Sequence, residues 1–141
     1  MTNVLIDTQF DDSIATALAA RSNALATYSK FAVGMAVKCK SGAVFVGANI
    51  ESRSFDLTMC AERVPAGAAV AGDDQEFVAM ALTSDLDEPI VPCGGCRQFL
   101  AEFNPELIIV RATVNDDRKT DSLSRLFPDA TKGILNDANP S

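Results

Sequence analysis

Three cysteines and one glutamate in this sequence have the types and the spacing of a catalytic metal site. Cys60 and Glu62 belong to a Cys-Ala-Glu-Arg segment, and Cys93 and Cys96 belong to a later Pro-Cys-Gly-Gly-Cys segment. Thiolate sulfur is a common ligand of Zn²⁺, and three protein ligands leave the fourth tetrahedral position open for water. The pattern therefore predicts a catalytic Zn²⁺ site with Cys60, Cys93 and Cys96 as ligands.

Glu62 is the candidate for acid–base chemistry at this site. Zinc lowers the pKa of bound water from about 15.7 toward about 7, so that hydroxide becomes available at neutral pH. A carboxylate that stands next to the ligands without being one can move protons between water and a substrate. This combination predicts hydrolytic removal of an amino group from a base, with Glu62 as the proton carrier.

Two other uses of the cysteines are compatible with the sequence. Cys93 and Cys96 could form a thioredoxin-like redox pair, with Cys60 as a buried thiol. Alternatively, Cys39 could complete a four-thiolate structural zinc site. The redox interpretation leaves the grouping of Cys60 with Glu62 unexplained. Cys39 has no close cysteine partner and lies in an alternating strand pattern, which favours a role as a small buried thiol.

Arg63 follows Glu62 directly and has a possible role in balancing charge. Three thiolates on a divalent cation leave a net negative cluster, and a guanidinium can offset it by donating hydrogen bonds to a ligand sulfur. Both cysteine segments are also predicted to begin helices, whose amino ends favour thiolate. Outside this context, Arg63 would be interpreted as a surface cation on a helix.

The composition narrows the substrate class. The chain has 141 residues, 48% of them hydrophobic and 22% charged, which is typical of one globular domain. We expect a single domain over 1–141, with a core at about 8–128 and an irregular tail at 129–141. The net charge of −7 argues against a nucleic-acid polymer and favours a small-molecule substrate. Because the chain has no histidine, acid–base chemistry falls to a carboxylate or to metal-bound water.

Two further features bear on the cellular location. The start, Met1-Thr2-Asn3, lacks a basic segment with an apolar core, and no apolar run approaches the roughly 18 residues of a membrane span. Four thiols without an export signal are typical of a reducing compartment. We therefore expect a cytoplasmic protein that has no membrane partner.

Hydrophobic periodicity predicts alternating strands and helices. Strands are expected at 33–40, 43–49, 77–83 and 107–110, with 111–115 as an extension or a further strand, and helices at 8–27, 60–71, 93–103 and 122–127. This order predicts an α/β sandwich in which helices cover a mixed sheet. The amino ends of the two cysteine-bearing helices are expected to meet at one edge of the sheet.

Four motifs in the same order and spacing resemble those of the small zinc-dependent cytidine deaminases of the homotetrameric, three-cysteine type. They are Tyr28-Ser29-x-Phe31-x-Val33-Gly34, Gly47-x-Asn49-Ile50-Glu51, Cys60-Ala61-Glu62-Arg63 and Pro92-Cys93-Gly94-Gly95-Cys96-Arg97-Gln98. The resemblance covers about 10–128. It implies a three-layer sandwich with a mixed sheet of about five strands, and hydrolytic deamination of cytidine and deoxycytidine to uridine and deoxyuridine in pyrimidine salvage. It also implies a homotetramer.

The resemblance implies particular roles for residues around the metal. Glu62 would shuttle protons, and the backbone of Ala61 would contact the base. Asn49 and Glu51 would form hydrogen bonds with the 3′-hydroxyl of the ribose. Taken without the motif, Asn49 is a turn residue at the end of a strand and Glu51 is a solvated charge on a loop.

Two aromatic residues receive roles in the same way, and two positions depart from the family pattern. Phe31 would line the pocket wall, and Phe55 would reach the pocket of a neighbouring subunit, although either could simply pack in the core. Thr131 stands where the family has a phenylalanine that stacks on the pyrimidine, and Arg53 replaces a small residue. The segment 64–70 is more similar to blasticidin-S deaminases, so a cytosine-nucleoside antibiotic or a modified cytidine is the alternative substrate.

Overall fold

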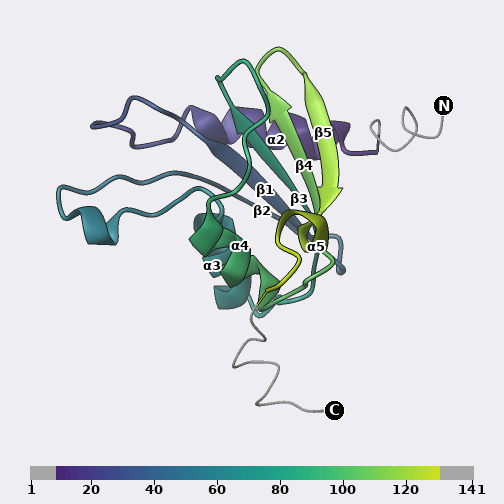
Figure 1. Ribbon diagram of the computed structural model, residues 1–141. Coiled ribbons are helices and arrows are strands. Elements are labelled where there is room, and N and C mark those ends of the chain that lie inside the picture. Colours follow the sequence, from purple (N-terminus) through teal and green to yellow (C-terminus); the bar gives the residue numbers. More distant parts are fainter. Residues whose placement is uncertain (1–8, 131–141) are drawn as a thin grey trace.

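The computed structural model describes residues 9–130, which form one five-stranded sheet with helices on both faces (Figure 1). The strands are β1 (Gly34–Cys39), β2 (Val44–Ala48), β3 (Phe77–Ser84), β4 (Ile108–Thr113) and β5 (Arg118–Ser122). Their order across the sheet is β2-β1-β3-β4-β5. β3 and β4 run parallel and the other neighbouring pairs run antiparallel, which confirms the predicted mixed sheet.

Helix α2 (Asp11–Arg21) covers one face of the sheet. Its buried residues Ile14 and Ala17 pack in one cluster with Ala36 of β1 and Ala81 of β3. The alanine side chains on this face are small, so the helix can pack close to the strands. Gly34 extends this close packing, since an added Cβ would lie only 1.9 Å from the carbonyl oxygen of Ala17.

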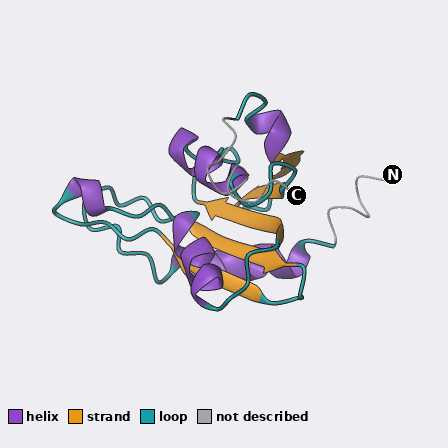
Figure 2. Cartoon of the chain, turned by 90° about the horizontal axis from the view of Figure 1, so that it is seen from below, coloured by secondary structure: helices purple, strands orange, loops and turns teal. Residues whose placement is uncertain are grey.

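The opposite face carries the larger side chains and two helices, α3 (Arg63–Ala71) and α4 (Gly94–Ala101). Met35 of β1 and Met80 of β3 are fully buried there, next in sequence to the alanines that face α2. Ala66 of α3 and Leu100 of α4 belong to the same cluster. This alternation follows from the two-residue period of a strand. Figure 2 shows helices on both sides of the strands, as expected for three layers.

Two predicted helix boundaries are wrong. The helix predicted over 8–27 ends at Arg21, because the N–H of Leu25 instead donates to the carbonyl of Asn49 at 3.0 Å. The helix predicted from residue 60 begins at Arg63, after a turn. That later start places Pro65 in the first helical turn, where its missing N–H costs little.

The carboxyl-terminal part of the sheet also differs from the expectation. The predicted extension 111–115 is in part the end of β4, which continues to Thr113. The separate edge strand β5 was not predicted, because its sequence Arg-Lys-Thr-Asp-Ser has no apolar alternation. Backbone pairing with β4 forms this strand. The short helix α5 (Leu123–Leu126) follows it directly.

Two loops extend together away from the sheet, and we call residues 49–60 the arm (Figure 1). The arm carries the short helix η1 (Phe55–Leu57) and lies beside the loop 22–33. Bridges between Leu25 and Ile50 and between Ile50 and Met59 hold the segments together. Within residues 9–130, no helix is long and apolar enough to cross a membrane.

Candidate active site and metal centre

The two cysteine segments meet at the amino ends of α3 and α4. Cys93 is the N-cap of α4, and its sulfur accepts a hydrogen bond from the N–H of Cys96 at 3.4 Å. Cys60 lies in the turn before α3, where its carbonyl accepts from the N–H of Arg63 at 3.1 Å. Helix amino ends carry free N–H groups and a partial positive charge, which favour thiolate.

The three sulfur atoms form a cluster of the size that a zinc ion requires. The Sγ atoms of Cys60 and Cys93 are 3.8 Å apart, those of Cys93 and Cys96 are 3.0 Å apart, and all three lie within 4.8 Å of one another. Zn–S bonds of about 2.3 Å in a tetrahedron place two sulfur atoms about 3.8 Å apart. The donor set therefore fits Zn²⁺ with three protein ligands.

Cys39 is not part of this cluster. Within residues 9–130, the group of potential ligands around these sulfur atoms contains Cys60, Cys93 and Cys96. Cys39 is buried in β1, where burial and the neighbouring Asp74 raise the pKa of its thiol to about 11. This placement agrees with the small buried thiol predicted from the sequence, and it argues against a four-thiolate structural site.

The three thiols of the cluster differ in their acidity. Burial raises the pKa of Cys60 and of Cys96, and the nearby charge of Glu62 adds to this effect. Burial also acts on Cys93, but hydrogen bonds from Cys96 and Cys60 outweigh it, so that the pKa of Cys93 is lowered. Cys93 is also the exposed member of the cluster.

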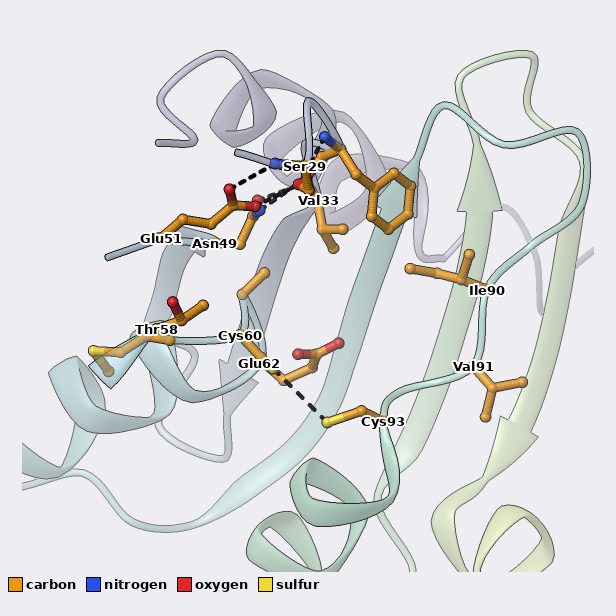
Figure 3. A pocket seen from close by; sticks show the side chains of 13 residues that line it. Ser29, Val33, Asn49, Glu51, Thr58, Cys60, Glu62, Ile90, Val91 and Cys93 are labelled. Carbon is orange, nitrogen blue, oxygen red and sulfur yellow. Dashed lines mark hydrogen bonds between the residues drawn. The ribbon is translucent and has the colours of Figure 1, made fainter. Parts of the chain in front are cut away.

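Glu62 lies at the N-cap of α3 with only 5% of its surface exposed. Burial raises the pKa of its carboxyl above the usual value, while hydrogen bonds from its own backbone and from Cys96, together with the charge of Arg63, oppose this shift. A raised pKa makes a carboxylate a better proton acceptor. Figure 3 shows the Glu62 carboxylate and the Cys93 sulfur at the same pocket.

A pocket of about 340 Å³ opens beside this cluster. It brings together most of the residues that the sequence singled out, namely Phe31, Asn49, Glu51, Cys60, Ala61, Glu62 and Cys93. The volume lies at the lower end of the range for small-molecule sites. Residues more than sixty positions apart in the chain therefore share one cavity.

The pocket also contains residues that the sequence analysis did not assign. Ile90 and Val91, from the loop before α4, form an apolar part of the wall (Figure 3). Ser29 and Thr58 add hydroxyl groups. Ser29 belongs to the motif Tyr28-Ser29-x-Phe31-x-Val33-Gly34, which could have identified it as a pocket residue. No motif in the sequence identifies Ile90 and Val91 as pocket residues, because a short apolar run before a proline is found in many loops.

Asn49 and Glu51 are both held by hydrogen bonds to the loop 28–33. The Asn49 amide donates to the carbonyl of Phe31 at 2.8 Å and accepts from the N–H of Val33 at 2.9 Å. The Glu51 carboxylate accepts from the N–H groups of Tyr28 and Ser29, at 2.9 and 3.0 Å, and from the Ser29 hydroxyl. The bonds from Ser29 lower the pKa of Glu51, which therefore stays ionised at neutral pH.

Three other residues of interest do not line this pocket. Phe55 is 74% exposed at the end of the arm, where its ring meets that of Tyr28 edge-on with centroids 5.8 Å apart. The Arg63 guanidinium donates to the carbonyl of Thr58 at 3.0 Å, so it braces the base of the arm. Arg53 is exposed on the arm. Thr131 lies outside the described residues.

Fold and site together define a zinc-dependent hydrolytic deaminase. The model of the cytidine and deoxycytidylate deaminase zinc-binding region matches residues 8–112, and the chain therefore belongs to this family. The predicted family and the zinc cofactor are thereby confirmed. Among curated proteins, the cytidine deaminase of Halalkalibacterium halodurans is 39% identical over 126 residues, covering 88% of this chain and 96% of that protein.

Other similar proteins agree. The cytidine deaminase of Sporosarcina psychrophila is 36% identical over 118 residues, which are 83% of this chain and 87% of that protein. The crystal structure of cytidine deaminase from Burkholderia pseudomallei has a TM-score of 0.82 and 40% identity, and the match covers 85% of this chain and 97% of that one. The cytidine deaminase structure from Mycobacterium tuberculosis has a TM-score of 0.77 and 31% identity, with coverages of 88% and 98%. The predicted three-layer fold is confirmed.

Proposed function

We propose that this chain converts cytidine and deoxycytidine, with water, into uridine and deoxyuridine plus ammonia, as a step of pyrimidine salvage. The observation that carries the proposal is the buried Glu62 carboxyl, which lies in one pocket with two of the three clustered cysteines. The curated relatives that cover most of this chain are named cytidine deaminases. Hydrolysis of an amino group needs this combination of a proton carrier and a metal site.

Glu62 carries the proton transfers of the proposed reaction. When bound by Cys60, Cys93 and Cys96, Zn²⁺ would supply Lewis acidity that makes water acidic near neutral pH. Glu62 takes a first proton from the attacking water and passes it to N3 of the ring, and it then takes the proton of the new C4 hydroxyl and passes it to the leaving amine. The C4–O bond forms, the C4–N bond breaks, and ammonia leaves. The positive charge of Arg63 stabilises the ionised form of Glu62 and so limits the rise of its pKa.

The remaining pocket residues orient the nucleoside. Asn49 and Glu51 form hydrogen bonds with the 3′-hydroxyl of the ribose, the backbone of Ala61 contacts the base, and Phe31 forms a wall. The lining residues that the structure describes include two carboxylates, Glu51 and Glu62, and no lysine or arginine. A phosphate group would be repelled there, so the pocket favours a neutral nucleoside over a nucleotide.

We further propose a cytoplasmic homotetramer that acts without a nucleic-acid or membrane partner. Large apolar side chains are exposed on the arm and the loop beside it, with Phe55 at 74% and Leu57 at 71%, and such a surface favours burial against another subunit. In the tetramer, Phe55 reaches the pocket of a neighbour. The cysteines of the site are free thiols, as a reducing cytoplasm would keep them. The net charge of −7 disfavours a nucleic-acid partner.

The test is turnover of cytidine by zinc-loaded protein, followed by the loss of its ultraviolet band and by ammonia release. The Glu62→Gln variant keeps the shape of the side chain but cannot take up the proton. We expect it to retain one zinc per chain and to lose at least about 10²-fold in kcat. Turnover at the wild-type rate in this variant would refute the role of Glu62.

One alternative substrate is favoured by a specific similarity. A blasticidin-S deaminase of Bacillus cereus is 28% identical to this chain over 90 residues, covering 58% of this chain and 64% of that protein. Competition between cytidine and blasticidin S at equal concentrations separates the two substrates. Preferential conversion of cytidine supports the proposal, whereas conversion of blasticidin S alone would replace it.

A further inference from the structure

The hydroxyl of Ser29 connects two residues that line the pocket. It donates a hydrogen bond to Oε2 of Glu51 and accepts one from the N–H of Phe31 at 3.0 Å. The carbonyl of Phe31 is held in turn by the amide of Asn49. The backbone of Phe31 is therefore fixed on one side by Ser29 and on the other by Asn49. Figure 3 shows Ser29 beside Glu51 and Asn49 at the upper part of the pocket.

Residues 28 and 29 donate three hydrogen bonds to the Glu51 carboxylate, which leaves it able to accept one more. Its Oε1 accepts from two backbone N–H groups and its Oε2 accepts from the Ser29 hydroxyl. An ionised carboxylate can accept about four hydrogen bonds. These three donors come from the protein, so there is capacity for one more donor, such as a single hydroxyl of a ligand in the pocket.

The backbone around Ser29 is placed tightly enough to give the carboxylate one orientation. The N–H of Lys30 donates to the carbonyl of Ala26 at 2.9 Å, and Lys30 has a φ of 59°, in the left-handed region that few non-glycine residues adopt. The N–H of Glu51 donates to the carbonyl of Leu25 at 2.9 Å. A glutamate side chain loses rotamer freedom when it is ordered, and a preformed partner reduces the cost of binding.

We propose that Ser29 is a positioning residue for the sugar of the substrate, because its hydroxyl turns the Glu51 carboxylate toward one ribose hydroxyl and thereby sets the affinity for a sugar that carries this hydroxyl. The inference rests on the proposed nucleoside deamination. Ser29 does not touch the reacting atoms, and it acts through Glu51. Its loss should therefore change substrate binding and leave the chemical step almost intact.

The experiment compares cytidine with 3′-deoxycytidine on the zinc-loaded full-length chain. For Ser29→Ala we expect KM for cytidine to rise about tenfold, with kcat unchanged within about twofold. For 3′-deoxycytidine, which lacks the hydroxyl, we expect the variant and the wild type to have the same KM within about twofold. Ser29→Thr keeps a hydroxyl and should restore KM for cytidine.

Ser41→Ala is the matched control. The Ser41 hydroxyl also donates to a carboxylate, that of Asp74 at 2.6 Å, and also accepts from the N–H two residues later, at 3.2 Å, but Ser41 does not line this pocket. This control should leave KM for both nucleosides unchanged. A second test uses the Glu51→Gln background, where Ser29→Ala should add less than about twofold, since the carboxylate is already gone.

Two outcomes would overturn the role of Ser29. One is an equal rise in KM for cytidine and for 3′-deoxycytidine, which would mean that Ser29 only supports the loop. The other is an unchanged KM for cytidine in Ser29→Ala. In both, rapid turnover of cytidine by the wild type leaves the proposed function standing. Wild-type protein that converts neither nucleoside would instead refute the proposed function, and the role of Ser29 with it.

Discussion

The sulfur of Cys60 lies 3.8 Å from that of Cys93, although the two residues are 33 positions apart in the chain. Each comes from the segment that leads into a different helix, α3 or α4. Both helices pack on the face of the sheet that carries the larger side chains. Packing of these two helices in the hydrophobic core therefore positions the metal site. A substitution in the core can move the cysteines, and loss of the metal can weaken the packing of the helices.

The cysteine cluster leads to a prediction about metal content. Replacing Cys60 or Cys93 by alanine removes one of three ligands, so we expect zinc content to fall from one ion per chain to nearly none, together with activity. Atomic emission on purified protein measures the zinc. Cys39→Ala is the matched control, because Cys39 is buried elsewhere and should leave the zinc content at one. Zinc loss in the Cys39 variant would show that the ligand set is wrong.

Asn49 is predicted to contribute to both stability and substrate binding. Asn49→Ala leaves the N–H of Val33 and the carbonyl of Phe31 without their partner, at a cost of roughly 1–3 kcal/mol in the free energy of unfolding. KM for cytidine should rise as well. Urea denaturation and steady-state kinetics measure the two effects.

Asn104→Ala is a suitable comparison for Asn49→Ala. The Asn104 amide also donates to a backbone carbonyl, that of Phe77 at 2.8 Å, and accepts from the N–H of Glu106 at 3.0 Å, but it does not line the pocket. Stability should fall in this variant while KM stays the same. An equal change of KM in both variants would mean that Asn49 acts only through the fold.

Asp121 should make the stability depend on pH. Burial alone would raise the pKa of its carboxyl, but the hydrogen bond from Arg111 at 2.6 Å and the charge of Arg125 lower the pKa below its usual value of 3.8. A lowered pKa in the folded state means that the stabilisation is present above pH 3.8 and is lost as the pH falls through the lower value. Asp121→Asn should therefore cost about 3 kcal/mol at pH 7, because Arg111 would stay buried without its partner.

Denaturation curves at several pH values test this expectation for Asp121. The difference between wild type and Asp121→Asn should shrink below pH 3.8. Asp11→Asn, which breaks an exposed pair with Arg118, is the control and should change the free energy of unfolding by less than about 1 kcal/mol. A difference for Asp121→Asn that stays constant down to the acid transition would contradict the linkage.

Phe55 supplies a prediction about subunit cooperation. If its ring completes a neighbour's pocket, Phe55→Ala should lower kcat/KM by up to about tenfold while zinc content stays at one per chain. Mixing Phe55→Ala subunits with Glu62→Gln subunits should then restore part of the activity, because each variant supplies what the other lacks. Light scattering gives the number of chains. A monomeric wild type, or no complementation on mixing, would refute this role.

The chemistry of the site could be predicted from the sequence alone. Metal ligation depends on residue type and short-range spacing, and both are visible in the segments around Cys60 and Cys93. The absence of histidine left a carboxylate as the proton carrier, which pointed to Glu62. Short runs of apolar and β-branched residues between turn signals identified β1 to β4 in the same way, because they too are local properties of the sequence.

Other features were decided only by the tertiary structure. The end of α2 at Arg21, the polar strand β5 and the pocket wall at Ile90 and Val91 each depend on partners far away in the chain. The bond between Ser29 and Glu51 has the same origin, since 22 positions separate the two residues. Residue types determine which chemistry is possible, whereas the pairing of distant segments determines which side chains meet. For this reason the three cysteines and Glu62 could be found in the sequence, but the hydrogen bond between Ser29 and Glu51 required the fold.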